Sequence, residues 1–158
     1  MSKIEVELTP SDMMLINIIG RNRSLISRAG GIKDVKQGNQ DGIDGDILGY
    51  TAEHAWAKHW NLFPDFQFTN RSGSPDGKIG RFSYDIKATD YPNGRLLCTL
   101  KENHSVDIYV LAIVDKNKVT FVGYAASEEL RQDKNIIDLG KGDTYALDQS
   151  KLRGFNKR

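Results

Sequence analysis

A nearly continuous run of apolar residues, 106–114, is the feature that most limits what this chain can fold into. Such a run is typical of a central strand in a sheet that is covered on both faces. Residues 79–88 alternate between apolar and polar side chains and are rich in β-formers, which predicts a half-buried strand. A further strand is expected at 119–124. The chain therefore needs a sheet at its centre and other elements to cover it.

Helices are expected before these strands. Thr9, Pro10 and Asp12 form a helix start, with Thr9 as the N-cap, proline at the first helical position and the acid closing a capping box. Residues at helical spacing then continue to Gly30–Gly31: Leu15, Ile18, Ile19, Asn22, Ile26 and Ala29. A second helix with a broad apolar face is predicted from about residue 46 to residue 61. A short third helix, capped by Ser127, should reach residue 131.

The length and composition indicate one domain. The chain has 158 residues, 39% of them hydrophobic, with 22 Lys and Arg against 21 Asp and Glu. We divide this single domain, 1–158, into an N-terminal helix, 10–30, a flexible Gly-rich loop, 30–45, a core, 46–131, and a C-terminal strap and basic tail, 139–158. The order of elements suggests an α/β or α+β fold, a mixed sheet flanked by helices.

The composition also limits location and partners. No apolar run approaches the roughly 20 residues that a membrane helix needs, so no membrane partner is expected. The first residues lack the apolar core of a signal peptide, and a lone Cys98 cannot form an internal disulfide. An intracellular, reducing and so cytoplasmic setting is the default. The net charge of +1 at first argues against a nucleic-acid-binding protein, because basic domains are the usual phosphate binders.

The segment from Pro75 to Lys87 carries the most informative chemistry. Asp85 and Lys87 stand two apart on one predicted strand, so their side chains share a face while Ile86 points to the other. If Asp76 meets Asp85 across a hairpin or bend, the two carboxylates form a pair of hard oxygen ligands that suits Mg²⁺. Lys87 would add a positive charge able to orient water and stabilise the transition state.

An ordinary strand with a same-face charge pattern is the usual reason for a D-x-K sequence. Two features of this chain favour a metal site over such a structural charge pattern. A Pro-Asp pair precedes the triplet at a turn, and Glu53 lies in the second predicted helix near Gly49, Trp56 and Trp60. The surroundings of Glu53 are therefore less polar than those of a surface acid.

Glu53 on a helix, then Pro75-Asp76, then Asp85-Ile86-Lys87, resembles the signature of the PD-(D/E)XK nuclease superfamily, whose fold is called restriction-endonuclease-like. The similarity covers roughly residues 46–131. It implies that Asp76 and Asp85 are metal ligands, that the main-chain carbonyl of Ile86 completes the shell, and that Lys87 positions the attacking water. Glu53 would be the accessory acid and a further ligand. The long Gly-rich loop before Glu53 departs from the family pattern.

By this resemblance the chain is a Mg²⁺-dependent DNA endonuclease that leaves 5′-phosphates, with Mn²⁺ as a substitute metal. A homodimer would be needed to cut both strands or a junction. Acidic side chains that bind a cation are neutralised by it and do not repel phosphates. The net charge of the chain therefore does not exclude a nuclease. The candidate nucleic-acid contacts, each of which could equally be a solvated surface group, are Thr89, Tyr91, Arg21, Arg23, Lys33, Lys36, Lys151 and Arg153.

Other candidate sites are weaker. His54 and His59 lie on different helix faces, and their spacing to Cys98 makes no zinc site, so we expect structural histidines and a buried, inert thiol. The aromatic residues Trp56, Trp60, Phe63 and Phe66 could stack on nucleic-acid bases, but their spacing favours core packing, with Phe66 and Phe68 in a short strand.

Three alternatives stay open. One is a Holliday-junction or branched-DNA resolvase of the same superfamily, and another is a catalytically silent module on this fold that binds nucleic acid or protein. The third is a sugar- or nucleotide-processing enzyme, which would need a small-molecule pocket. The sequence does not distinguish DNA from RNA as the substrate.

Overall fold

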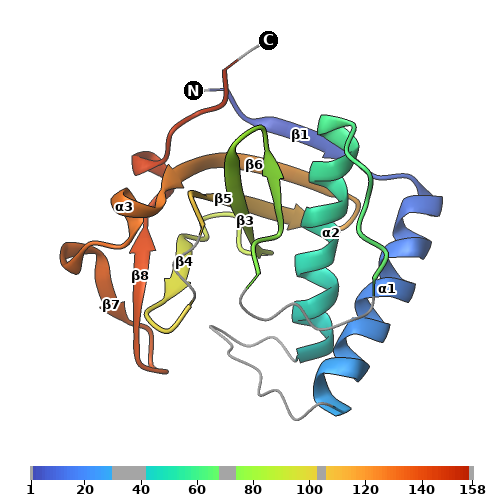
Figure 1. Ribbon diagram of the computed structural model, residues 1–158, viewed down its shortest axis with the longest axis horizontal. Coiled ribbons are helices and arrows are strands. Elements are labelled where there is room, and N and C mark those ends of the chain that lie inside the picture. The colour runs from blue at the N-terminus through green and yellow to red at the C-terminus, as the bar shows by residue number, and fades with distance from the viewer. Residues whose placement is uncertain (1, 30–41, 68–73, 103–105, 157–158) are drawn as a thin grey trace.

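A computed structural model describes residues 2–29, 42–67, 74–102 and 106–156 and shows a mixed α+β fold (Figure 1). Its centre is a curled five-stranded mixed sheet flanked by helices. The strand order is β1 (Ile4–Glu7), β6 (Lys118–Ala126), β5 (Ile108–Asp115), β3 (Phe82–Thr89) and β2 (Gly77–Ile79). The β3–β5 pair is parallel, and the other neighbouring strands are antiparallel.

A second, smaller antiparallel sheet lies beside the main one (Figure 1). It contains β4 (Leu96–Thr99), β8 (Asp143–Leu147) and β7 (Ile136–Asp138), in that order. A short helix, α3 (Ser127–Leu130), follows β6, and two single 3₁₀ turns lie at Asp133–Asn135 and Gln149–Lys151. One of the two buried clusters of the described residues joins this sheet to β5, β6 and α3.

The two long helices, α1 (Pro10–Ala29) and α2 (Gly42–Trp60), lie on the other side of the main sheet (Figure 1). The α2 helix contacts β3 and β5, and α1 packs along α2. Trp56 of α2 is at the centre of the second buried cluster, where its ring centroid is 5.0 Å from that of Phe121 in β6. This packing fixes the face of α2 that carries Glu53 relative to β3.

The predicted start of the first helix is confirmed. Thr9 Oγ1 accepts a hydrogen bond from the Asp12 amide at 3.1 Å, and Asp12 Oδ2 accepts one from the Thr9 amide at 2.8 Å. Asp12 also binds α2, because Lys58 Nζ lies 2.7 Å from its Oδ2 and His54 Nε2 lies 3.1 Å from its Oδ1. One carboxylate therefore both caps α1 and joins it to α2.

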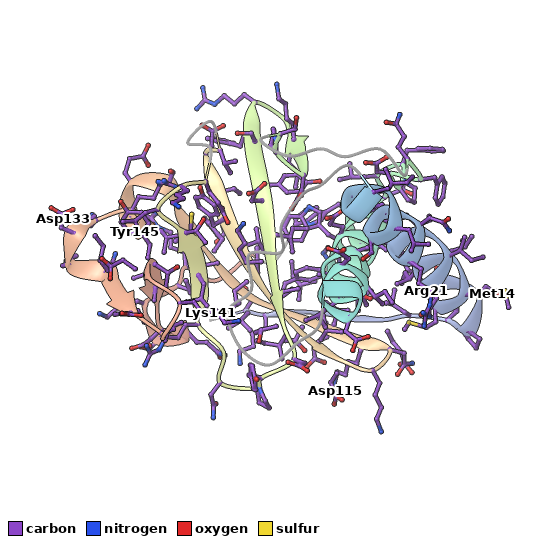
Figure 2. All side chains as sticks on the ribbon, turned by 90° about the horizontal axis from the view of Figure 1, so that it is seen from below. Met14, Arg21, Asp115, Asp133, Lys141 and Tyr145 are labelled. Atoms are coloured by element: carbon purple, nitrogen blue, oxygen red, sulfur yellow. The ribbon has the colours of Figure 1, made fainter. Side chains whose placement is uncertain are left out.

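The inward face of α1 differs from the one that spacing suggested. Ile16, Ile19 and Ser24 are buried, whereas Leu15, Ile18 and Ile26 are exposed. Gly20 lies on this inward face, where a side chain would press on Ile47 of α2, and the glycine lets the two helices approach closely. An apolar stripe is left on the outer side of α1, where Figure 2 shows Met14 pointing away from the sheet.

The strand predictions are largely confirmed, with corrections. The apolar run is strand β5, paired on both sides and almost fully buried. The expected strand 79–88 is divided by a two-residue turn at Gly80 and Arg81, and Gly80 has the positive φ, 58°, that such a hairpin turn requires. Phe66 lies outside any strand, and Phe68 is outside the described residues.

Two helix boundaries also differ from expectation. The α2 helix begins at Gly42, so the end of the predicted loop, residues 42–45, is helical, and the rest of that loop, from residue 30, lies outside the described ranges. The N-cap of α3 is Ala126 and not Ser127, with Glu129 Oε2 accepting the Ala126 amide hydrogen at 3.0 Å. None of the helices in the described ranges is long and apolar enough to span a membrane.

Candidate active site

The β2–β3 hairpin brings the two acids of the motif together. Its register pairs Gly77 with Tyr84, so Asp76 lies opposite Asp85. The Asp76 amide donates to Asp85 Oδ1 at 3.2 Å, and the Ile86 amide donates to Asp76 Oδ2 at 2.7 Å. Gly77 is required here, because a Cβ at that position would overlap the Tyr84 hydroxyl.

The two carboxylates are costly to ionise in this position. Burial raises the pKa of Asp76 well above its usual range, and the charges of Glu53 and Asp85 raise it further. Burial also raises the pKa of Asp85, with Glu102 adding to the effect and Lys87 opposing it. A cation beside Asp76 and Asp85 would relieve both the desolvation and the repulsion.

Lys87 lies on the expected face of β3 but is bound mainly by an acid that the motif does not include. Its Nζ is 2.9 Å and 2.8 Å from the two carboxylate oxygens of Glu102 and 3.5 Å from Asp85 Oδ2. Although burial opposes the charged form, Glu102 and Asp85 together raise the pKa of Lys87. Lys87 is therefore held as an ammonium between two carboxylates.

Glu102 in turn belongs to a polar cluster behind the site. Cys98 Sγ lies 3.3 Å from Glu102 Oε2, and Arg131 Nη1 donates to both Cys98 Sγ and the Tyr109 hydroxyl at 3.1 Å. The expected burial of Cys98 is confirmed, and burial raises the pKa of its thiol to about 11. Sequence spacing offered no signal for Glu102, which follows β4 fifteen positions after Lys87.

Glu53 reaches the same region from α2, and Arg23 of α1 accompanies it. Arg23 Nη1 is 3.2 Å from Glu53 Oε2, and Nη2 is 3.2 Å from Asp65 Oδ2. The remaining guanidinium hydrogen bonds go to the main-chain oxygens of Asp65 and Gln67. Arg23, which was expected among the nucleic-acid contacts, is instead turned inward and paired with Glu53 and Asp65.

A cavity of about 550 Å³ lies between α2, the segment that follows it and the β2–β3 hairpin. Asp76 and Glu53 line it, together with Ile86 and Tyr84 from the face of β3 that is opposite to Lys87. Asp85 and Lys87 are not among its lining residues. Asp76 and Glu53 therefore face the cavity, whereas Asp85 and Lys87 lie on the opposite face of β3.

Two polar groups of the cavity wall are unusual. The Tyr50 hydroxyl and His54 Nδ1 are buried and have no hydrogen-bond partner among the described residues. A buried polar atom left unpaired costs on the order of 1–3 kcal/mol. Burial raises the pKa of Tyr50 to about 12, with Arg23 opposing the shift, so its hydroxyl keeps its proton. Both atoms are enclosed in the wall, so a ligand would meet them only after a side-chain movement.

Whether this site can bind a metal ion depends on which oxygen and nitrogen atoms lie close together. In the described part of the chain, no group of three or more His, Cys, Asp or Glu side chains is arranged to hold a metal ion. The residues nevertheless fit a cation in one respect, since Asp76 and Asp85 are adjacent, desolvated carboxylates whose oxygens suit Mg²⁺. His54 is buried, and its Nε2 lies 3.1 Å from Asp12 Oδ1.

The remaining predicted contact residues are dispersed. Tyr91 is exposed just after β3, with its amide donating to Thr89 Oγ1 at 3.2 Å. Arg21 is exposed on α1, while Arg153 is paired with Glu129 through two hydrogen bonds from its Nε, at 2.9 Å and 3.2 Å. Lys151 is exposed in the last 3₁₀ turn, and Lys33 and Lys36 are outside the described residues.

The aromatic residues after the second helix correct the sequence interpretation. Trp56 is in the core as expected, and Trp60 is partly buried against it. Phe63, however, is 89% exposed and Phe66 is 41% exposed, both on the wall of the cavity. Apolar spacing does not distinguish these two residues from core residues, because the chain leaves the helix at Asn61 and turns them outward.

Comparison of the chain with protein families, with curated protein sequences and with solved structures gave no match.

Proposed function

We propose that the chain is a Mg²⁺-dependent DNA endonuclease with a restriction-endonuclease-like fold, with its active site at Asp76, Asp85 and Lys87. The observation that carries the proposal is the juxtaposition of Asp76 and Asp85 across the β2–β3 hairpin, where each partly buried carboxylate accepts one main-chain amide hydrogen. Like charges in a desolvated position are expected where a divalent cation binds.

The residues divide the chemistry among them. Asp76, Asp85 and the carbonyl of Ile86 would hold Mg²⁺, and Glu53, paired with Arg23, would lie beside them on α2. The bound ion would supply a positive charge for the scissile phosphate and a lowered pKa for a water. Lys87, held as an ammonium by Glu102 and Asp85, would orient that water and stabilise the negative charge that builds on the phosphate.

The bond changes follow from this arrangement. The oxygen of water bonds to phosphorus while the bond from phosphorus to the 3′-oxygen breaks. The leaving oxygen takes up a proton and becomes a 3′-hydroxyl, and the phosphate stays on the 5′ side. Mn²⁺ prefers similar oxygen ligands and would substitute for Mg²⁺.

Cleavage of supercoiled plasmid, branched DNA and RNA, each with Mg²⁺, with Mn²⁺ and with a chelator, tests the proposal. We expect cutting only with metal and a loss of about 10²–10³-fold in rate for Asp85→Asn and Lys87→Ala. Lys134→Ala removes an exposed lysine far from the hairpin and should cut normally. If the wild type cuts no substrate, or Lys87→Ala cuts as fast as Lys134→Ala, the nuclease assignment is lost.

A catalytically silent nucleic-acid- or protein-binding module is the alternative. It gains nothing from a pair of carboxylates that are costly to ionise, and this cost favours the enzyme. Binding of DNA without metal-dependent cutting would support the silent module. Preferential cutting of branched DNA would instead indicate a junction resolvase on the same site.

We also propose that the protein forms a homodimer, because the outer face of α1 carries a row of exposed apolar side chains. The exposed stripe of α1 is the surface that a second copy would cover, and its residues are Met14, Leu15, Ile18, Leu25 and Ile26. A patch of this kind is larger than the scattered apolar side chains of a typical monomer surface. A symmetric dimer would use this same helix face on both chains.

Light scattering during size-exclusion chromatography measures this state directly. Ile18→Glu should convert a dimer to a monomer, since it places a charge in the stripe. Leu139→Glu is the matched control, because Leu139 is 47% exposed and Ile18 is 49% exposed, but Leu139 follows β7 on the other side of the molecule. A monomeric wild type would refute the dimer.

A further inference from the structure

We propose that the cavity beside Asp76 binds an unpaired nucleobase, so that the enzyme acts on single-stranded or locally unpaired nucleic acid. The inference rests on the proposed function in assuming that the ligand is a nucleic acid. It adds that the site accepts an unpaired strand rather than a duplex, a choice that the sequence motif does not make.

The first argument is the shape of the site. The cavity of about 550 Å³ falls within the range of small-molecule pockets, and the catalytic Asp76 is part of its wall. A base that stays paired inside a duplex cannot enter such a cavity, and enzymes that place a base in a pocket act on single strands or turn the base out of the stack. A strand that enters here would bring a base and its own phosphate to Asp76 together.

The second argument is the aromatic pair on the cavity wall. The rings of Phe63 and Phe66 meet edge to face with their centroids 5.7 Å apart, and both are exposed. Neither belongs to the buried clusters of the described residues. Exposed aromatic faces next to a phosphate-binding site are the usual platform on which unpaired bases stack.

The third argument is the unpaired polar groups of the inner wall. The ring of His54 uses Nε2 toward Asp12 Oδ1, so in the neutral ring Nε2 carries the hydrogen and Nδ1 is an acceptor. The Tyr50 hydroxyl can donate or accept, and its ring lies edge to face with His54 at 6.0 Å between centroids. Both atoms are enclosed, so a nucleobase edge, which offers donors and acceptors, would pair with them after a small side-chain movement, whereas an aliphatic ligand would satisfy neither.

The charge around the cavity fits a strand that lies across its mouth. Lys78 of β2 is exposed and lines the cavity on the side of Asp76. Arg81 follows in the hairpin turn and is also exposed. These two cations can contact the phosphates that flank the bound base directly. Asp76 is negatively charged and would contact a phosphate only through a bound metal ion.

Fluorescence anisotropy in buffer with a chelator measures binding in the absence of cleavage. The probes are a labelled 12-nucleotide single strand, the same sequence as a duplex, and a mononucleotide. We expect the wild-type protein to bind the single strand at least tenfold more tightly than the duplex. Phe63→Ala and Phe66→Ala should each weaken binding of the single strand about fivefold or more, the lower limit for loss of one stacked base.

Leu139→Ala is the matched control, because Leu139 is 47% exposed after β7 and does not line the cavity. It should bind the single strand as the wild type does. Phe63 and Phe66 are exposed, so their variants are expected to fold, and an unchanged melting temperature checks this.

Three results would overturn the inference. They are equal binding of duplex and single strand, wild-type affinity in both phenylalanine variants, and binding of the mononucleotide as tightly as the strand, which would assign the cavity to free nucleotides. The test is separate from that of the nuclease. If binding depends on the phenylalanines but no DNA or RNA is cut, the base site is supported and the nuclease proposal is refuted. If DNA is cut at the same rate by both phenylalanine variants, the nuclease proposal is supported and the base site is refuted.

Discussion

Replacing Asp76 with asparagine should make the metal-free protein more stable while it removes the activity. The carboxylate is partly buried, its pKa is raised by desolvation and by Glu53 and Asp85, and Lys87 is the cation that opposes the shift. Asparagine keeps an oxygen for the Ile86 amide, now 2.7 Å from Asp76 Oδ2, and has no charge to desolvate. The variant thus keeps the hydrogen bond from the Ile86 amide and loses the free-energy cost of a desolvated negative charge.

The size of the effect follows from known replacements of buried ions by neutral groups, which commonly stabilise proteins by about 1–4 kcal/mol. A gain of about 2 kcal/mol would raise the melting temperature by about 4–8 °C for a chain of this size. Saturating Mg²⁺ should reverse the order, because ligand at a hundred times its Kd stabilises the wild type by about 2.7 kcal/mol. The variant lacks one of the two principal ligands and should gain far less.

The pH dependence has a definite sign. A carboxyl whose pKa is raised in the folded state binds more protons folded than unfolded, so the wild type loses stability as pH rises from the usual value of 3.8 through the raised pKa. Asparagine does not titrate. The advantage of Asp76→Asn should therefore grow as pH rises through the raised pKa and disappear at low pH, where Asp76 is protonated.

Thermal unfolding followed by circular dichroism, at several pH values with chelator and with Mg²⁺, measures all three effects. Asp133→Asn is the matched control, because Asp133 is exposed on the other side of the molecule (Figure 2) and should show neither the gain nor the altered response to metal. A less stable Asp76→Asn protein in chelator at pH 8, or equal stabilisation of wild type and variant by Mg²⁺, would refute the reasoning.

Three further outcomes follow from the contacts. Glu102→Gln removes the main charge that raises the pKa of Lys87, so the alkaline limb of the pH–rate profile should move to lower pH, and an unmoved limb would separate Glu102 from the chemistry. Asp12→Ala removes the α1 cap and the contact to Lys58 and should lower the free energy of unfolding by about 1–2 kcal/mol in urea titrations at pH 7. Gly123→Ala would place a Cβ 2.6 Å from the Arg153 main-chain oxygen, and a loss of about 1–3 kcal/mol by the same titration is expected, with wild-type stability as the contrary result.

Local patterns in the sequence were enough for much of the framework. The capping box at Thr9 and Asp12, the central strand at 108–115 and the shared face of Asp85 and Lys87 each depend on residues close together in the chain. Backbone periodicity and turn chemistry act over a few residues, and so these features could be read without a structure. The meeting of Asp76 and Asp85 was also within reach, because a short hairpin joins them.

Contacts between distant residues were decided only by the tertiary structure. Arg23 meets Glu53 because α1 packs along α2, and Glu102 meets Lys87 from the segment that follows β4. Neither pair has a sequence spacing from which the contact could be predicted. The exposure of Phe63 and Phe66 likewise depends on where the chain leaves α2. The sequence by itself determined which residue types and faces the site would use. The packing of helices against the sheet decided which charges meet there and that a cavity opens beside Asp76, because such packing depends on the shapes of many side chains that are far apart in the chain.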